Sequence, residues 1–106
     1  MANEDFAITE DKSHKDFIRF TVNGRVNTLS ADLLLEKLEG ALNEEHKNIV
    51  LNMSQVPYLS STGIRAILKI YKEATEAGGK FHIEFPSENV KNVLGITALN
   101  DLLVSK

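Results

Sequence analysis

The chain has 106 residues, 42% hydrophobic and 25% charged, which fits a single domain over residues 1–106 with a core of ordinary size. It contains no cysteine, which excludes disulfides, thiolate zinc sites and cysteine nucleophiles, and its net charge of −3 argues against nucleic-acid binding. No apolar run approaches the ~18 residues that span a membrane, and no signal peptide is visible, so we expect a cytoplasmic protein without membrane contact.

The first segment of the chain predicts an antiparallel hairpin. Phe6 to Glu10 alternates weakly between polar and apolar residues, Lys12 to Asp16 is a polar turn, and Phe17 to Val22 alternates cleanly. Asn23-Gly24 ends the second of these strands. Asn-Gly also favours a further hairpin into Arg25 to Thr28, but we prefer a simple turn because the residues that follow have a helical pattern.

The next segment predicts a helix followed by a central strand. Ser30 is a suitable N-cap for a helix over about Ala31 to Asn43. The apolar stripe of this helix is formed by Leu34, Leu35, Leu38, Ala41 and Leu42. Ile49, Val50 and Leu51 then form an unbroken apolar run, which is typical of a central strand covered on both faces.

The second predicted helix runs from about Ser61 to Ala77 and ends at Gly78-Gly79. Its apolar arc contains Ile64, Ile67, Leu68, Ile70, Tyr71 and Ala74. We interpret the opposite arc as a solvated face on which cations pair with acids, namely Arg65, Lys69 and Lys72 with Glu73 and Glu76. This face would flank any partner that docks at the helix start.

The last segment predicts a strand and two short helices. The strand runs from Phe81 to Phe85, with Phe81, Ile83 and Phe85 on one face, and Pro86 closes it. Ser87 caps a short helix that ends at Gly95. Thr97 then caps a final short helix that carries Leu99, Leu102 and Leu103.

This order of elements predicts an α/β fold with a mixed sheet. We expect four to five strands, an N-terminal hairpin plus parallel strands, packed against about four helices. Functional sites in such sheets lie at the carboxyl ends of strands, where Ser60-Ser61-Thr62 follows the central strand and begins a helix. A hydroxyl there serves as an N-cap, a nucleophile or a phosphorylation site, because the helix start has free N–H groups and tolerates a phosphate.

The patterns that indicate catalysis or metal binding are weak. A nucleophile elbow needs glycine on both sides of the serine, and only Gly63 is present. His14 and His46 fall in polar turns, and His82 points outward from a strand. Three acids lack metal-ligand spacing, namely Glu10, Asp11 and Asp16. We therefore expect a binding module that is not an enzyme and has no cofactor or metal of its own.

Nearly the whole chain resembles the STAS domain, the sulfate-transporter and anti-sigma-factor-antagonist fold. The resemblance is carried by Gly24-Arg25-Val26-Asn27, Ile49-Val50-Leu51-Asn52-Met53-Ser54, Tyr58-Leu59-Ser60-Ser61-Thr62-Gly63-Ile64-Arg65 and Ala77-Gly78-Gly79. It implies a bacterial anti-sigma factor antagonist, whose serine at the helix start is phosphorylated by a partner that is both anti-sigma factor and kinase. A PP2C-like phosphatase removes the phosphate. The matching residue is Ser61, with Thr62 and Ser60 as minor alternatives.

The resemblance also implies a partner-binding surface. The unphosphorylated form is expected to bind the anti-sigma factor and free the sigma factor through Asn27, Ser60, Ser61, Thr62, Gly63 and Arg65. ATP and Mg²⁺ belong to the partner kinase. Ser60, Asn27 and Asn52 stand where many members carry acids, and asparagine keeps the hydrogen bonds but loses the charge. Two alternatives stay open: a STAS scaffold that binds without phosphorylation, and a small hydrolase that uses Ser61.

Overall fold

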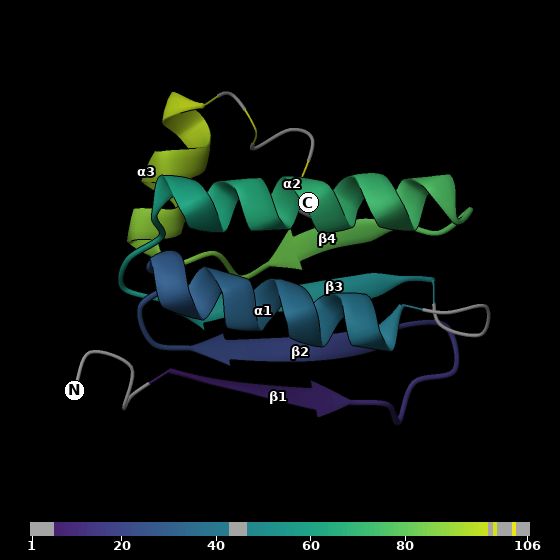
Figure 1. The fold of residues 1–106 in the computed structure, drawn as a ribbon. Coiled ribbons are helices and arrows are strands. Elements are labelled where there is room, and N and C mark those ends of the chain that lie inside the picture. The colour runs from purple at the N-terminus through teal and green to yellow at the C-terminus, as the bar shows by residue number, and fades with distance from the viewer. Residues whose placement is uncertain (1–5, 43–46, 98, 100–102, 104–106) are drawn as a thin grey trace.

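One four-stranded mixed sheet organises the molecule (Figure 1). The computed structural model describes residues 6–42, 47–97, 99 and 103. Its elements are β1 (Ala7–Asp11), β2 (Ile18–Asn23), α1 (Thr28–Ala41), β3 (Ile49–Gln55), α2 (Ser61–Glu76), β4 (Phe81–Glu84) and α3 (Glu88–Ile96). The strand order is β1-β2-β3-β4, with β1 and β2 antiparallel and the other pairs parallel. The predicted α/β class, N-terminal hairpin and parallel strands are therefore confirmed.

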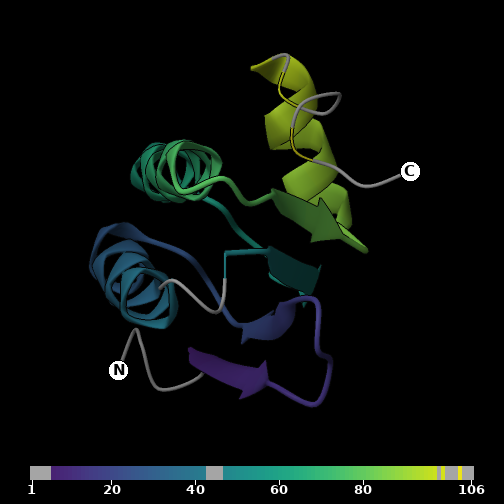
Figure 2. The same ribbon diagram turned by 90° about the vertical axis from the view of Figure 1, so that its right-hand side faces the viewer.

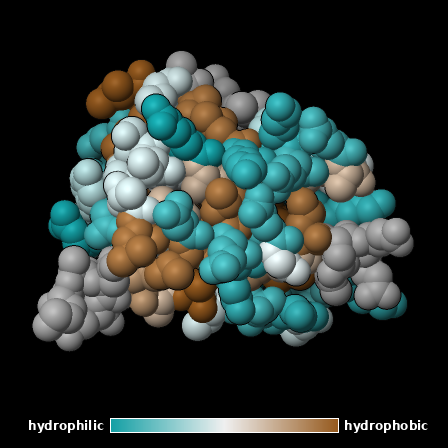
Figure 3. All heavy atoms as spheres, in the orientation of Figure 1, coloured by the Kyte–Doolittle hydropathy of each residue, from teal (hydrophilic) through white to brown (hydrophobic). Residues whose placement is uncertain are grey.

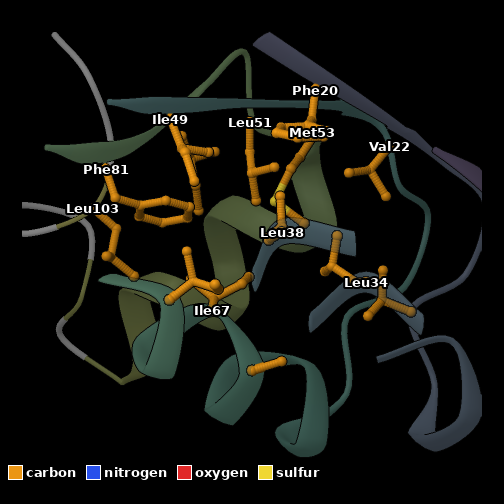
Figure 4. Close-up of a cluster of buried hydrophobic side chains, with 14 of the residues drawn as sticks. Phe20, Val22, Leu34, Leu38, Ile49, Leu51, Met53, Ile67, Phe81 and Leu103 are labelled. Atoms are coloured by element: carbon orange, nitrogen blue, oxygen red, sulfur yellow. The ribbon is translucent and has the colours of Figure 1, made fainter. Parts of the chain in front are cut away.

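The helices α1 and α2 cover one face of the sheet, and α3 lies beyond β4 (Figure 2). The alternation of β2 explains this arrangement, because Ile18, Phe20 and Val22 all point to the helix side and are fully buried. Leu51 of β3 and Ile67 of α2 belong to the same buried cluster, as predicted (Figure 4). The core that positions the site thus lies between the sheet and these two helices.

The opposite face of the sheet is polar. Arg19 Nε on β2 donates to Glu84 Oε2 on β4 at 2.8 Å, so this ion pair reaches across β3 and raises the pKa of Arg19. Val50 is buried beneath this layer and borders, with His82, a hollow of about 350 Å³. Asn52 is also on this face, in register with Glu84. The sequence predicts that β3 is covered on both faces. On this face, polar side chains cover it, and no helix of the described residues does.

The helix α1 begins earlier than predicted, because Asn27 and not Ser30 is its N-cap. Asn27 Oδ1 accepts a hydrogen bond from Ser30 N at 3.0 Å, and Ser30 Oγ accepts one from Asn27 N at 2.8 Å. This reciprocal capping box places Ser30 inside the first turn, where it is buried. Thr28 therefore opens the helix, and the alternative hairpin after Gly24 does not form.

The strands β3 and β4 differ in length from their predicted spans. β4 ends at Glu84, and Phe85 turns away with a φ of 52° and 65% of its surface exposed. A positive φ interrupts the extended backbone, so the prediction that Phe85 continues the inward-facing row is wrong. β3 continues past the predicted apolar run to Gln55, because Met53 is buried as well.

The helix ends agree with the prediction for α2 but not for α3. Gly78 has a φ of 89° and ends α2 as predicted. The helix α3 passes through Gly95, the predicted stop, and reaches Ile96. Thr97 is its C-cap and not the N-cap of another helix, and Thr97 Oγ1 donates to Val93 O at 3.0 Å. The rest of the predicted last helix, apart from Leu99 and Leu103, lies outside the described residues, as do Asn43 and His46.

Candidate functional site

The starts of α1, α2 and α3 gather at the carboxyl ends of β2, β3 and β4 (Figure 1). This follows from the connectivity, because α1 follows β2, α2 follows β3 and α3 follows β4, and the three strands are parallel. Ser60-Ser61-Thr62 lies at this end, between β3 and α2. Free backbone N–H groups and the positive ends of helix dipoles therefore meet around the hydroxyl run.

Ser60, and not Ser61, caps α2. Ser60 has extended backbone angles, with φ −82° and ψ 170°, and its Oγ accepts a hydrogen bond from Gly63 N at 3.1 Å. The same oxygen shares a 2.8 Å hydrogen bond with Thr62 Oγ1. Thr62 Oγ1 in turn donates to Thr28 Oγ1 at 3.5 Å, which links the starts of the two helices. Both flanking hydroxyls of the run are thus engaged in the fold.

Ser61 is the first residue of α2 and is exposed to solvent. Its hydroxyl makes no hydrogen bond within the described part of the chain. Because Ser60 supplies the cap, the helix start does not require the Ser61 hydroxyl. Of the three consecutive hydroxyls, the one that matches the family's serine is therefore the one that faces outward.

The turn before α1 and the loop before α2 are joined through their backbones. Val26 N donates to Tyr58 O at 2.8 Å, and Ser60 N donates to Val26 O at 2.9 Å. These bonds form a parallel bridge between Val26 and Leu59. Asn27 is consequently held beside the hydroxyl run, with its side chain occupied in capping α1.

Gly63 is buried beneath this junction. A Cβ atom at Gly63 would lie 2.6 Å from Leu59 Cδ1 and 2.8 Å from Val26 Cγ1. Both distances are shorter than packed atoms allow, so glycine is what lets α2 approach the bridge. Gly63, which the resemblance includes in the partner surface, therefore supports that surface from beneath and presents no side chain to it.

Two arginines and two apolar side chains surround the hydroxyl run. Arg65 is exposed one turn after Ser61 on α2. Arg25 Cζ lies 4.8 Å from the centre of the Tyr58 ring, a cation–π contact. Leu29, in the first turn of α1, is 57% exposed, and Tyr58 is 38% exposed. Sequence reasoning missed Arg25, Leu29 and Tyr58 as site residues, because a contact between two distant loops leaves no periodic pattern.

The cations of α2 are not paired as predicted. Lys69 Nζ lies 3.6 Å from Glu39 Oε2 on α1, and among the described residues it forms no ion pair with Glu73 or Glu76. Arg65 has no ion-pair partner among the described residues. Burial, together with a hydrogen bond to Glu39, raises the pKa of Glu73. The solvated face therefore contains two cations without an ion-pair partner among the described residues, Arg65 and Lys72, and Arg65 is the one that lies a single turn from Ser61.

The hydroxyl run has no catalytic partners within the described residues. His14 Nε2 lies 3.8 Å from Asp11 Oδ2 in the first hairpin, and His82 is on β4, so neither histidine hydrogen-bonds to Ser61. In the same part of the chain, no group of three or more His, Asp or Glu residues is arranged to hold a metal ion. The site consists instead of an exposed hydroxyl with charged and apolar groups around it.

The length and composition of the helices bear on whether one of them could cross a membrane. Among residues 6–42, 47–97, 99 and 103, no helix has both the length and the apolar composition needed to cross a membrane. The most apolar faces of α1 and α2 are turned toward the sheet and are buried there.

Known proteins are similar to this chain in sequence, and solved structures are similar to it in fold. The anti-sigma-B factor antagonist of Bacillus subtilis (strain 168) is 28% identical over 92 residues, which cover 87% of this chain and 84% of that protein. The protein of the same name from Staphylococcus epidermidis is 27% identical over 94 residues, or 89% and 87% of the two chains.

Solved structures show the same fold at lower identity. The anti-sigma factor antagonist SpoIIAA in its unphosphorylated form superposes with a TM-score of 0.81 at 16% identity, covering 94% of this chain and 88% of that one. The phosphorylated form of Bacillus SpoIIAA gives a TM-score of 0.75 at 15% identity, covering 94% and 91%. The sequence profile of the STAS domain matches residues 9–106. This match, together with the mixed sheet and the bridge between the segments that precede α1 and α2, shows that the chain belongs to the STAS domain family.

Proposed function

We propose that this chain is a cytoplasmic anti-sigma factor antagonist. The family assignment and the names of its curated relatives support this function. The observation that carries it is the position of Ser61, an exposed hydroxyl at the start of α2 that the fold does not use. In the unphosphorylated form, the surface around Ser61 binds an anti-sigma factor that is also a serine kinase, and the sigma factor is released.

Phosphorylation of Ser61 by that partner, with ATP and Mg²⁺ bound to the kinase, switches the binding off. A phosphate adds about −1.5 to −2 charges. The start of α2 tolerates this charge because of the helix dipole, and no acid lies in the first turn. The fold therefore persists, while the interface meets a bulky, hydrated charge. A PP2C-like phosphatase then restores the binding form. Ser60 and Thr62 are minor sites, since their hydroxyls are hydrogen-bonded to each other.

Mass spectrometry tests the modification. The anti-sigma factors encoded in the genome that carries this chain are purified and incubated with the chain, ATP and Mg²⁺, and the phosphopeptides are mapped. We expect the phosphate on Ser61, and we expect Ser61→Ala to abolish the main phosphorylated species. Thr62→Val is the matched control and should still be modified. Full phosphorylation of Ser61→Ala would show that another residue is the acceptor.

Calorimetry tests the switch. Ser61→Ala should bind the anti-sigma factor nearly as well as the unmodified chain, whereas Ser61→Asp should bind much more weakly, because an uncompensated charge in an interface costs several kcal/mol. Thermal melts should give nearly equal stabilities for the three proteins, since an acid at a helix start contributes only a few tenths of a kcal/mol. A lowered melting temperature for Ser61→Asp would assign its loss of binding to damage at the helix start.

A STAS scaffold that binds without phosphorylation is the second candidate. It is favoured by the absence of acids beside Ser61, since Asn27 and Ser60 occupy the two cap positions and no acid lies in the first turn of α1 or α2. Equal binding by the Ser61 variants, with no phosphate on any of them, would support this candidate. A hydrolase that uses Ser61 would instead be labelled at Ser61 by a serine-reactive phosphonate, and Ser61 lacks a histidine partner within the described residues.

A further inference from the structure

The surface around Ser61 combines exposed apolar area with unpaired positive charge. We call it the Ser61 face and define it by Arg25, Leu29, Tyr58, Ser61 and Arg65. Figure 3 shows apolar surface on the side of the molecule where α1 begins. Leu29 is 57% exposed in the first turn of α1 and does not belong to the buried cluster, and clustered exposed apolar side chains often mark an interaction site.

The five residues come from segments that the fold holds next to one another. The bridge between Val26 and Leu59 holds the Arg25 turn against the Tyr58 loop, and the Arg25 guanidinium lies over the Tyr58 ring. The hydrogen bond between Thr62 and Thr28 holds the start of α2 beside the start of α1, which carries Leu29. Ser61 and Arg65 are four residues apart on α2, and they therefore lie on the same side of the helix.

The charge of the Ser61 face is positive, although the chain as a whole has a net charge of −3. Neither arginine forms an ion pair within the described residues, and the first turns of α1 and α2 contain no acid. Some cations elsewhere in the described chain are paired with acids, such as Lys37 with Glu10 at 3.1 Å and Arg19 with Glu84 at 2.8 Å. The Ser61 face thus carries two guanidinium groups that can form ion pairs with carboxylates of another molecule. Arginine is the cation best suited to such a contact.

We propose that the Ser61 face binds an acidic surface of the anti-sigma factor. Carboxylates of that partner pair with Arg25 and Arg65, and an apolar side chain between them packs on Leu29 and Tyr58. This proposal rests on the proposed function and specifies the chemistry of the partner. It also specifies how the switch works, because a phosphate on Ser61 is one helical turn from Arg65. The phosphate forms an ion pair with Arg65, so Arg65 no longer pairs with the partner, and the phosphate also repels the partner's carboxylates.

Charge reversal tests this proposal. The binding of the full chain to the purified anti-sigma factors of its own genome is measured by calorimetry and stopped flow, at low and high salt. Arg25→Glu and Arg65→Glu should each weaken binding roughly tenfold or more, and should slow association at low salt. Lys80→Glu makes the same change in net charge at the amino end of β4, on the far side of the sheet from the Ser61 face, and should change the affinity by less than about twofold.

A second pair of variants tests the apolar part. Leu29→Ser should weaken binding, whereas Ile96→Ser, which alters a side chain that is 85% exposed at the end of α3, should not. Thermal melts of all variants establish that each is folded. Replacing a partner carboxylate by lysine should restore binding to Arg65→Glu but not to the unmodified chain, which a merely structural role of Arg65 would not produce.

The outcomes separate the two proposals. If the unmodified chain binds an anti-sigma factor and both arginine reversals bind as tightly or more tightly, the acidic-partner inference is wrong and the proposed function stands. If no anti-sigma factor of that genome binds, both proposals fail. A fluorescent DNA duplex is included, and arginine-dependent binding to it at comparable affinity would overturn the assignment of the Ser61 face to an acidic protein.

Discussion

Ser60 Oγ accepts a hydrogen bond from Gly63 N at 3.1 Å, and this contact decides which serine of the pair is structural. The N-cap of α2 is Ser60, so Ser61 lies one position inside the helix with its hydroxyl in solvent. A cap and a modifiable hydroxyl are therefore adjacent but separate residues. A change at one need not disturb the other, and this separation makes the roles of the two serines distinguishable by measurement.

Replacing Ser60 should destabilise the protein more than replacing Ser61. Ser60→Ala removes the cap and should lower the free energy of unfolding by about 0.5–2 kcal/mol, because an N–H at the helix start loses its partner. Ser61→Ala removes no hydrogen bond and should change it by less than about 0.5 kcal/mol. Urea denaturation of both variants measures the difference. Equal effects would indicate that the two hydroxyls share the cap.

Two glycine-to-alanine changes should act in opposite directions. Gly63→Ala places a Cβ 2.6 Å from Leu59 Cδ1 and should cost about 1–3 kcal/mol of stability, since the side chains of Leu59 and Val26 must shift. Gly40→Ala is the matched control in α1, where nothing lies within 4 Å of the new Cβ. It should stabilise the protein by about 0.4–1 kcal/mol, because alanine lowers the entropy of the unfolded chain. Thermal and chemical denaturation of both variants test the pair.

Shortening Leu51 should strongly destabilise the fold. Leu51 is fully buried on β3 against the helices, and Leu51→Ala should cost about 2–5 kcal/mol through lost packing and the cavity that remains. Leu29→Ala, at a position that is 57% exposed, is the control and should change the stability by less than about 0.5 kcal/mol. A Leu51→Ala variant as stable as the control would contradict the central position of β3.

The acids Glu73 and Glu10 should affect the pH dependence of stability with opposite sign. Burial and the neighbouring Glu39 raise the pKa of Glu73 above 4.5. The folded state therefore binds more protons between 4.5 and that raised value, and stability falls as the pH rises through this window. Glu73→Gln should consequently be more stable than the unmodified chain at neutral pH, and the advantage should vanish at acid pH.

The hydrogen bond with Lys37 lowers the pKa of Glu10 below 4.5. Glu10 thus stabilises the fold above 4.5, and its contribution is lost as the pH falls through the lowered value. Glu10→Gln should be less stable than the unmodified chain at neutral pH and equal to it in acid. Urea titrations between about pH 3 and pH 8 compare the two variants. If Glu73→Gln and Glu10→Gln changed the stability at neutral pH in the same direction, the explanation given for Glu73 would be ruled out.

The order of elements and the place of the site could be predicted from the sequence because burial on one face imposes a local period. The alternation of Phe17 to Val22 and the apolar arc of α2 record which side chains face the core. The hydroxyl run Ser60-Ser61-Thr62 follows β3 for the same reason, since a site at a strand end is adjacent in sequence to the strand. Such features need no knowledge of distant contacts.

Tertiary structure decided what depends on residues that are far apart in the chain. The pairing of Val26 with Leu59 brings the Arg25 turn to Tyr58 and leaves no room for a side chain at Gly63. It also decides that Lys69 pairs with Glu39 on α1 while Arg65 stays unpaired. The charge and the exposure of a site depend on several segments that meet in the fold. The periodicity of apolar residues depends on one segment only and can therefore be read from the sequence. The sequence by itself therefore determined the elements and the serine, and the packing of two loops determined the surface around it.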